Sequence, residues 1–348
     1  MRPYAKLYLT RKGERAARSG HPWVYGEEVT HVDGQYKTGD LVDVLSEKGK
    51  YLGTGFANDI SKIRVRIVSH NANDRFDEAF WQRRVQYALA YRRTVMGEKD
   101  FACCRLIFGD ADEMPGLTVD RYNDLLVAQT LCYGMDVVKP VIFKALTEQL
   151  RLMGVTVRGI YERNDVRVRE LDGMEQYKGW YRASYLPEPG SVLTTIDENG
   201  ILYDVDVENG QKTGFFLDQK YNRLAVAKIA TGHHVLDCFT HTGAFALNAA
   251  RGGAASVTAV DISDEAVAMT RENIRRNGLE DKVTARQANV FDLLTDLADH
   301  KNHDYDFIIL DPPAFTKSGH TVRNAIRGYK EINLKAMKLL PRGGYLAT

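Results

Sequence analysis

The spacing of hydrophobic residues changes along the chain and divides it into three parts. In residues 1–72, hydrophobic and polar residues alternate in short stretches such as "DLVDVLS" and "KIRVRIV", with glycine-rich turns between them. Alternation of this kind predicts half-buried strands joined by turns. The first part is therefore expected to be a small β-rich domain.

The middle part, residues 73–185, contains stretches with helical spacing of hydrophobic residues and stretches with strand-like spacing. Hydrophobic residues recur at helical spacing from Phe76 to Met96, and a second helix is expected at about 136–153. Between them, "CRLIFGDADEMPGLTVDRYNDLLVAQTL" holds two strand-like runs around turn residues, and "GIYERND" reads as a further strand. This pattern predicts an α+β domain with a β-hairpin, followed by a linker at "YLPEPGS", residues 185–191.

In the last part, residues 186–348, strands and helices alternate. Apolar runs such as "HHVLDCF", "SVTAVDIS" and "YDFIILDPP" are separated by helical segments such as "DEAVAMTRENIRRNGL". This order predicts an α/β domain with a doubly wound parallel sheet. Ligands of such sheets bind beyond the carboxyl ends of the strands, so functional residues are expected there.

Polar residues follow the first three predicted strands of this sheet. Asp237 ends the first strand, and Gly243 lies in the next turn, where the missing Cβ lets backbone approach a ligand. Asp261 ends the second strand and is placed to accept hydrogen bonds from ribose hydroxyls, and Asn289 follows the third strand, near an adenine edge. Because the G-x-G-x-x-G fingerprint is absent, a cofactor with a cationic amino group, such as S-adenosylmethionine, fits better than a dinucleotide. A plain strand–turn–helix and a simple helix cap remain the alternative readings.

The fourth predicted strand ends in "LDPPAF". Proline fixes the backbone and lacks an N–H, so Asp311 and the carbonyl groups after it form a rigid set of acceptors. Such acceptors can hold the amino edge of a planar base, and Phe315 can stack on its face. Asp311 and Pro312 are the candidate catalytic residues, and Asp311 also belongs to the candidate cofactor-binding set. A purely structural turn is the alternative.

The net charge of +1 does not by itself indicate a nucleic-acid-binding protein, but its distribution is uneven. Residues 1–25 carry six Lys and Arg residues against one acidic residue, which gives a local charge of +5. Arg11 and Lys12 in this stretch, with Arg64 and Arg66 in "SKIRVR", are candidate contacts to RNA phosphates. An ordinary solvated surface is the competing interpretation.

The remaining composition restricts the class of protein. The four cysteines have neither metal-ligand spacing nor a disulfide pattern, so no metal is expected. No apolar run approaches the roughly 18 residues of a membrane span, and the N-terminus lacks the apolar core of a secretory signal. A cytoplasmic protein without a membrane partner is expected.

Over nearly its whole length the sequence resembles the ribosomal large-subunit (cytosine-5) methyltransferase I family. The similarity lies in "GHPWVY", "GDADEMPGLTVDRY", "ENGQKTGFFLDQKYNR", "VLDCFTHTGAF" and "LDPPAF". The resemblance implies a class I S-adenosylmethionine-dependent RNA methyltransferase, with a PUA domain (1–72), a middle domain (73–185) and a methyltransferase domain (186–348). Ribosomal RNA is the implied partner, and a homodimer is left open.

The resemblance also implies cofactor contacts in the "QKTGFFLDQKYNR" block, at Lys212, Phe216, Gln219 and Arg223. The two aromatic residues with amide and basic groups suit a lid over the cofactor, whereas an entry helix packed on the sheet is the alternative. The chain departs from the family's pattern at His241, where small residues are common, which puts the detailed contacts of that loop in doubt. It also has Asn289 where many class I enzymes have an acid.

Methylation of cytosine at carbon 5 of 23S ribosomal RNA, the reaction that the resemblance implies, needs a thiolate that adds to carbon 6. The residue after Asp-Pro-Pro is Ala314, Cys238 reads as a small core residue, and the family's cysteine would come directly after Thr348. The chain as given is therefore expected to bind the cofactor without methylating cytosine. An amino-group methyltransferase acting on RNA, which needs no thiol, and a non-catalytic RNA-binding protein stay open as alternatives.

Overall fold

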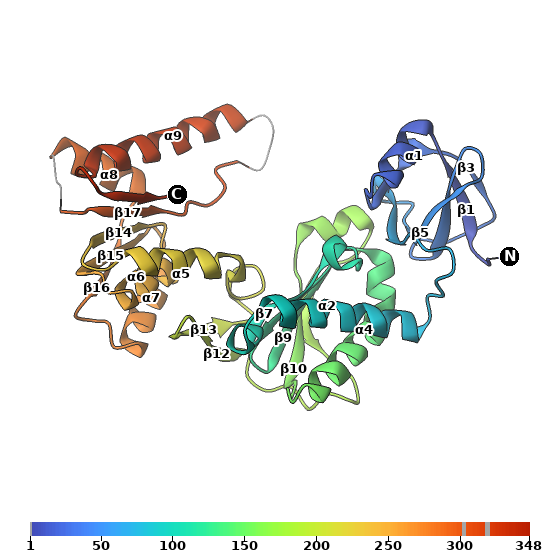
Figure 1. The fold of residues 1–348 in the computed structure, drawn as a ribbon, viewed down its shortest axis with the longest axis horizontal. Coiled ribbons are helices and arrows are strands. Elements are labelled where there is room, and N and C mark those ends of the chain that lie inside the picture. The colour runs from blue at the N-terminus through green and yellow to red at the C-terminus, as the bar shows by residue number, and fades with distance from the viewer. Residues whose placement is uncertain (1, 301–303, 317–320) are drawn as a thin grey trace. The chain divides into compact units, whose positions relative to one another are not determined.

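A computed structural model describes residues 2–300, 304–316 and 321–348, which form two compact units (Figure 1). The first unit comprises Met1–Thr194 and Val205–Phe215, and the second comprises Thr195–Asp204 and Phe216–Thr348. Among the helices in the described part of the chain, none is both long enough and apolar enough to cross a membrane.

The N-terminal part of the first unit is a six-stranded sheet with one helix, as the alternating pattern predicts. Its strand order is β2-β6-β5-β4-β1-β3, in which β1 and β4 are parallel and the other neighbours antiparallel. Along β1, inward Leu7 and Leu9 alternate with partly exposed residues, which is why this run forms a half-buried strand. The elements are β1 (Ala5–Leu9), α1 (Arg11–Arg18), β2 (Trp23–Tyr25), β3 (Val29–Asp33), β4 (Leu41–Ser46), β5 (Tyr51–Ala57) and β6 (Ile63–Ser69).

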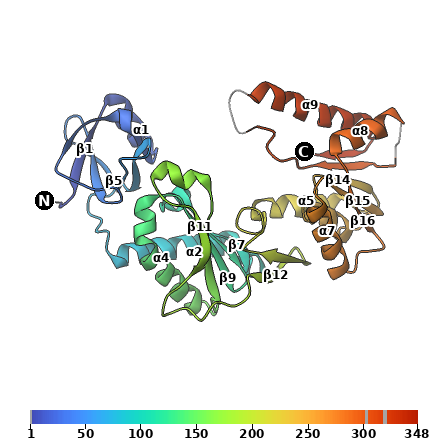
Figure 2. The same ribbon diagram turned by 180° about the vertical axis from the view of Figure 1, so that it is seen from behind.

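The middle part of the first unit is the expected α+β domain. Its sheet has the order β11-β10-β9-β8-β7, and α2 and α4 pack against each other beside it (Figures 1 and 2). The segment expected to form a single hairpin forms three antiparallel strands, because "CRLIF" pairs with β8 as well. The elements are α2 (Glu78–Val95), α3 (Glu98–Phe101), β7 (Cys103–Phe108), β8 (Leu117–Tyr122), β9 (Leu125–Thr130), α4 (Tyr133–Leu152), β10 (Gly159–Asn164) and β11 (Tyr177–Tyr181).

The two parts of the first unit share a hydrophobic core. The ring of Phe56 in β5 stacks on Trp81 in α2 at a centroid distance of 5.9 Å. Gly134 in α4 lies so close to Phe56 that a Cβ there would come within 2.1 Å of its ring. The β-rich part therefore packs on α2 and α4 through buried aromatic rings.

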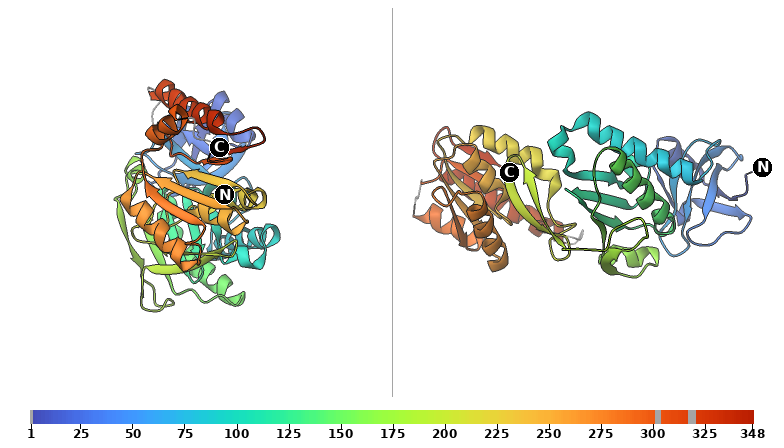
Figure 3. Two further views of the ribbon diagram at one scale, coloured as in Figure 1. Left: turned by 90° about the vertical axis from the view of Figure 1, so that its left-hand side faces the viewer. Right: turned by 90° about the horizontal axis from the view of Figure 1, so that it is seen from below.

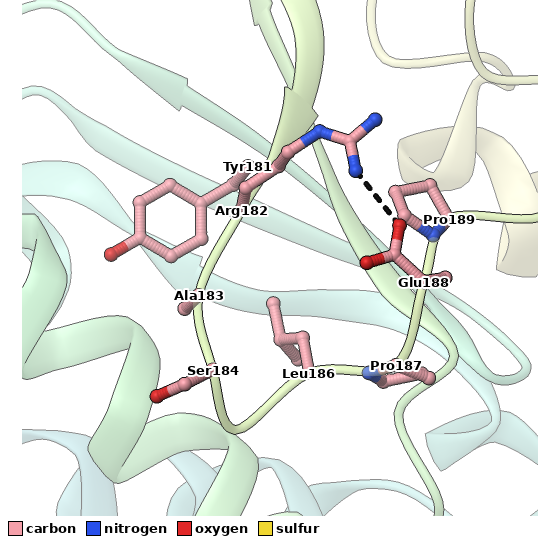
Figure 4. Close-up of a pocket in the computed structure, with 8 residues that line it drawn as sticks. All are labelled: Tyr181, Arg182, Ala183, Ser184, Leu186, Pro187, Glu188 and Pro189. Carbon is pink, nitrogen blue, oxygen red and sulfur yellow. Dashed lines mark hydrogen bonds and ion pairs between the residues drawn. The ribbon is translucent and has the colours of Figure 1, made fainter.

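The predicted linker lies in a loop that precedes a hairpin the sequence did not predict, β12 (Leu193–Glu198) with β13 (Ile201–Asp206). The loop between β11 and β12 forms an open pocket of about 340 Å³, lined by residues 181–184 and 186–189. Figure 4 shows its residues, with Arg182 and Glu188 joined by an ion pair of 3.0 Å. No candidate site residue lines this pocket.

The second unit holds a doubly wound parallel sheet of order β16-β15-β14-β17-β18, with helices packed on it (Figures 1 and 3). Leu236, Val260 and Ile308 face α8 and α9 in one hydrophobic core, whereas α6 and α7 pack on β14, β15 and β16. Helix α8 was not predicted. The elements are α5 (Lys220–Ile229), β14 (His234–Cys238), α6 (Ala244–Arg251), β15 (Ser256–Asp261), α7 (Asp264–Arg276), β16 (Val283–Gln287), α8 (Val290–Asp299), β17 (Phe307–Leu310), α9 (Val322–Leu339) and β18 (Tyr345–Ala347).

Candidate functional site

Two candidate residues of the second unit lie where the strand order reverses, between β14 and β17. Where the connections after two neighbouring parallel strands run in opposite directions along the sheet, a crevice opens at the carboxyl ends of the strands. This crevice is the usual ligand site of such folds. Asp237 lies at the end of β14, and Asp311 directly follows β17. The expectation that functional groups meet at this edge agrees with the topology.

Asp237 is fully buried at the end of β14. Its Oδ2 accepts hydrogen bonds from the Thr240 hydroxyl and from the Ala246 backbone N–H at 3.0 Å, whereas its Oδ1 has no partner among the described residues. Burial, to which the charges of Asp311 and Asp261 add, raises the pKa of Asp237 to about 7. One oxygen thus fixes the turn, and the other is a buried acceptor suited to a cationic amino group.

The turn after β14 carries unusual backbone strain. Phe239 and His241, neither of them glycine, have φ values of 63° and 53°, in the left-handed region. Gly243 has φ 81°, and a Cβ on it would come within 2.7 Å of the Thr270 side chain in α7. The glycine was expected to let backbone approach a ligand; the structure shows that it makes room for α7.

His241 lies in the turn between β14 and α6. Its backbone N–H donates to Asp261 Oδ2 at 2.9 Å, and its ring packs edge-on against Phe216 at 5.2 Å. Burial lowers the pKa of the His241 imidazole, although Asp261 opposes this. The ring is therefore neutral at pH 7 and packs against Phe216.

Asp261, at the end of β15, and Asn289, two residues after β16, have part of their hydrogen-bonding capacity unused. The two Asp261 oxygens accept from the backbone N–H groups of His241 and Ser263, at 2.9 and 3.0 Å, and each keeps a lone pair for a ribose hydroxyl. Asn289 caps the unpredicted α8, because its Oδ1 accepts from Phe291 N at 3.0 Å, but its amino group donates to no described residue. The polar groups at these strand ends fit S-adenosylmethionine.

The second half of the segment expected to form a lid is helical. Residues Leu217–Gln219 form a 3-10 turn and continue into α5, so the entry-helix alternative describes this part of the block. Arg223 is buried in α5; its guanidinium binds Glu198 with two hydrogen bonds of 2.6 and 2.9 Å and donates to the Phe216 carbonyl at 2.7 Å. Through these bonds Arg223 also holds the Phe216 backbone, and Gln219 accepts from the Asn222 side chain at 2.6 Å.

The turn after β17 is braced by α9. Phe315 stacks on Tyr329 at 4.4 Å and packs against Phe291 at 5.6 Å, and the Tyr329 hydroxyl accepts from Phe315 N at 3.3 Å. One face of the ring that was expected to stack on a base is therefore covered by Tyr329. The Asp311 side chain stays exposed. Sequence reasoning missed Tyr329, because nothing local connects it to a turn fourteen residues earlier.

The proposed RNA contacts of the first unit differ strongly in environment. The guanidinium of Arg66, a proposed RNA contact, is partly buried; it pairs with Asp172 at 3.3 Å and lies over the Trp23 ring, so it joins two parts of the unit. Arg64 also forms an ion pair, with Asp59. Both side chains therefore have partners inside the first unit.

Arg11 and Lys12 lie on the exposed side of α1. They form ion pairs with Glu47 at 3.8 Å and with Glu27 at 3.3 Å, both well exposed and therefore weak. Arg15 on the same helix is exposed and forms no ion pair with a described residue, although sequence reasoning counted it only toward the charge. The exposed cations of α1 remain the candidates for RNA.

Comparison with known proteins agrees with this site. A PUA-like domain family matches residues 7–70, and an S-adenosylmethionine-dependent methyltransferase family matches residues 165–348. The "Ribosomal RNA large subunit methyltransferase I" of Shewanella amazonensis is 39% identical over 336 residues, which cover 96% of this chain and 82% of that protein. The protein of the same name from Klebsiella pneumoniae is 35% identical, over 99% of this chain and 84% of its own length.

Solved structures support the fold. The methyltransferase SMU.776, solved with SAH, superimposes with a TM-score of 0.76 at 23% identity, over 98% of this chain and 84% of its own. An S-adenosylmethionine-dependent methyltransferase from Streptococcus mutans gives a TM-score of 0.71 at 22% identity, over 96% and 89% of the two chains. The chain is thus an S-adenosylmethionine-dependent methyltransferase with a PUA-like domain, and it belongs to the ribosomal RNA large subunit methyltransferase I family.

Proposed function

We propose that the chain serves to methylate carbon 5 of a cytosine in 23S ribosomal RNA. The observation that carries the proposal is the rigid Asp311-Pro-Pro turn beside the buried Asp237, at the strand ends where the sheet reverses. The names of the relatives that are 35–39% identical, over nearly the whole chain, support ribosomal RNA as the substrate. The exposed cations of α1 support contact with RNA phosphates.

The cofactor, when bound, supplies an electrophilic methyl group, and the residues of the chain bind and orient it. In the proposed arrangement Asp237 Oδ1 accepts from its amino group, Asp261 accepts from its ribose hydroxyls, and the Asn289 amino group donates to its adenine. Lys212 and Phe216 are further proposed contacts. This assignment rests on the spare hydrogen-bonding capacity of the three polar groups and on the packing of Phe216 against His241.

In the proposed reaction Asp311 accepts a hydrogen bond from the cytosine amino edge and holds the base in place. Carbon 5 becomes nucleophilic only when a thiolate has added to carbon 6. All four cysteines of the sequence are buried, and burial raises the pKa of Cys132 to about 11 and that of Cys238 further. A buried neutral thiol is a poor nucleophile, so we assign the thiolate to none of these four cysteines.

Nucleoside analysis of ribosomal RNA tests the proposal. Protein-free large-subunit RNA is incubated with methyl-labelled S-adenosylmethionine and either the 348-residue chain or the product of the whole reading frame that contains it. We expect 5-methylcytidine from the latter. Methylation of an amino nitrogen, or no methylated cytidine, overturns the carbon-5 assignment. Formation of 5-methylcytidine by the 348-residue chain itself overturns the assignment of the thiolate.

A further inference from the structure

Two side chains of α7 bind the backbone of the turn after β14. The Thr270 hydroxyl donates to the His241 carbonyl at 2.9 Å, a bond that it shares with the Ala266 carbonyl of its own helix. The Asn273 side-chain amide donates to the Thr242 carbonyl, also at 2.9 Å. Both side chains are buried, so water does not compete for these bonds. No role has been given above to either bond.

The carbonyl groups that α7 holds belong to a strained stretch of backbone. Phe239, His241 and Gly243 have φ values of 63°, 53° and 81°, so every second residue of the turn lies in the left-handed region. A residue other than glycine keeps such a conformation only where the surrounding contacts over-determine it. The bonds from α7 end on His241 itself and on the residue after it, so they are contacts of this kind.

The same turn orients two carboxylates of the candidate site. The Thr240 hydroxyl donates to Asp237 Oδ2, and the His241 backbone N–H donates to Asp261 Oδ2 at 2.9 Å. His241 therefore belongs to both sets of bonds, because its carbonyl accepts from α7 and its N–H holds Asp261. A turn released from α7 would no longer fix either carboxylate in the position that it has here.

Stability alone explains Asn273 poorly. Its Oδ1 is buried and has no hydrogen-bond partner among the described residues. A buried polar atom without a partner lowers stability, so an apolar side chain would fill this position at a smaller cost. An amide that holds the turn with its nitrogen while its oxygen is unpaired is better explained by the bond to Thr242.

We infer that Thr270 and Asn273 are positioning residues, through which α7 fixes the turn after β14 and thereby sets the affinity for S-adenosylmethionine and for SAH, its product. The inference rests on the proposed contacts of Asp237 and Asp261 with the cofactor. All of these residues lie in the second unit. Removing either bond from α7 should therefore weaken cofactor binding by more than the accompanying loss of stability explains.

Two asparagines four residues apart provide the test and its control. Asn273 lies in α7 and binds the turn, whereas Asn277, the C-cap of the same helix, binds the hairpin β12–β13. The Asn277 side chain donates to the Leu202 carbonyl at 2.8 Å and accepts from the Leu202 N–H at 2.9 Å. Affinity for SAH is measured by calorimetry on Asn273→Leu and Asn277→Leu, and unfolding of the second unit is followed by hydrogen exchange of β14.

We expect Asn273→Leu and Thr270→Val each to weaken SAH binding by about tenfold, and Thr270→Ser, which keeps the hydroxyl, to stay within about twofold of the wild type. Asn277→Leu should lower the stability of the second unit and leave SAH affinity unchanged. Wild-type affinity in both Asn273→Leu and Thr270→Val overturns the inference. An equal loss of affinity in Asn277→Leu also overturns it, because binding would then follow general stability. If Asn273→Leu does not fold, the two Thr270 variants decide.

Asp261→Ala separates this inference from the proposed function. It removes the proposed ribose acceptor itself, so it should weaken SAH binding whether or not α7 positions the turn. If Asp261→Ala weakens binding and the α7 variants do not, the proposed contact survives and the role of α7 is wrong. If Asp261→Ala binds SAH as the wild type does, the ribose contact is wrong, and the α7 variants still decide the inference.

Discussion

The buried carboxyl group of Asp237 should make the second unit less stable as the pH rises. Its pKa lies near 7 in the folded chain against 3.8 in an exposed reference, because burial disfavours the charged form. Between these two values the folded state binds a proton that the unfolded state has released, so raising the pH favours unfolding. A difference of about three pKa units corresponds to about 4 kcal/mol in total, of which about 3 kcal/mol falls between pH 5 and pH 8.

Asp237→Asn should abolish this loss, because the amide does not titrate and its carbonyl can still accept from Thr240 and Ala246. Urea unfolding at pH 5 and pH 8 measures the effect in the absence of cofactor. The three tryptophans, at 23, 81 and 180, lie in the first unit, so unfolding of the second is followed by far-ultraviolet circular dichroism and by hydrogen exchange of β14.

Asp281→Asn, at an exposed position of the same unit, serves as the control and should behave as the wild type does. The comparison of the two variants removes the contribution of all other titrating groups, because these are common to both. If the wild type and Asp237→Asn lose stability in parallel between pH 5 and pH 8, the carboxyl group does not titrate as a buried acid and the reasoning is wrong.

Three further predictions concern other buried contacts. Gly243→Ala should destabilise the second unit by about 1–3 kcal/mol in urea unfolding, since a Cβ at φ 81° also meets Thr270; a neutral effect would show that the turn relaxes freely. Arg223→Met should lower the free energy of unfolding of the second unit by about 3–5 kcal/mol, because it leaves the Glu198 carboxylate buried and unpaired. Adding Glu198→Gln should recover part of this stability, and no recovery would contradict the ion-pair explanation. Arg66→Met should lower the unfolding temperature of the first unit, because it removes the ion pair with Asp172, and should leave the salt dependence of RNA binding unchanged. A shallower salt dependence in filter-binding assays would show that Arg66 contacts an RNA phosphate.

The sequence alone was sufficient to predict the order of the strands around the site. Strand periodicity, followed by a polar residue at each strand end, located Asp237, Asp261 and Asp311 at the correct edge of a parallel sheet. These features are local, because a strand, its end and the following turn lie within about ten residues. The same reasoning missed α8, because residues up to Val290 were taken as a strand. Asn289 is in fact the N-cap of this helix.

Only the tertiary structure decided which charged side chains are free to bind a ligand. Arg223 and Glu198 are 25 residues apart, and Arg66 and Asp172 are 106 apart. In each pair, burial by other elements removes the competing water and commits the group to its partner, which neither residue's neighbours in sequence reveal. Arg66 and Arg11 both stand in basic stretches of the sequence. In the structure, Arg66 is partly buried against the buried Asp172, whereas Arg11 extends into solvent and pairs with the exposed Glu47.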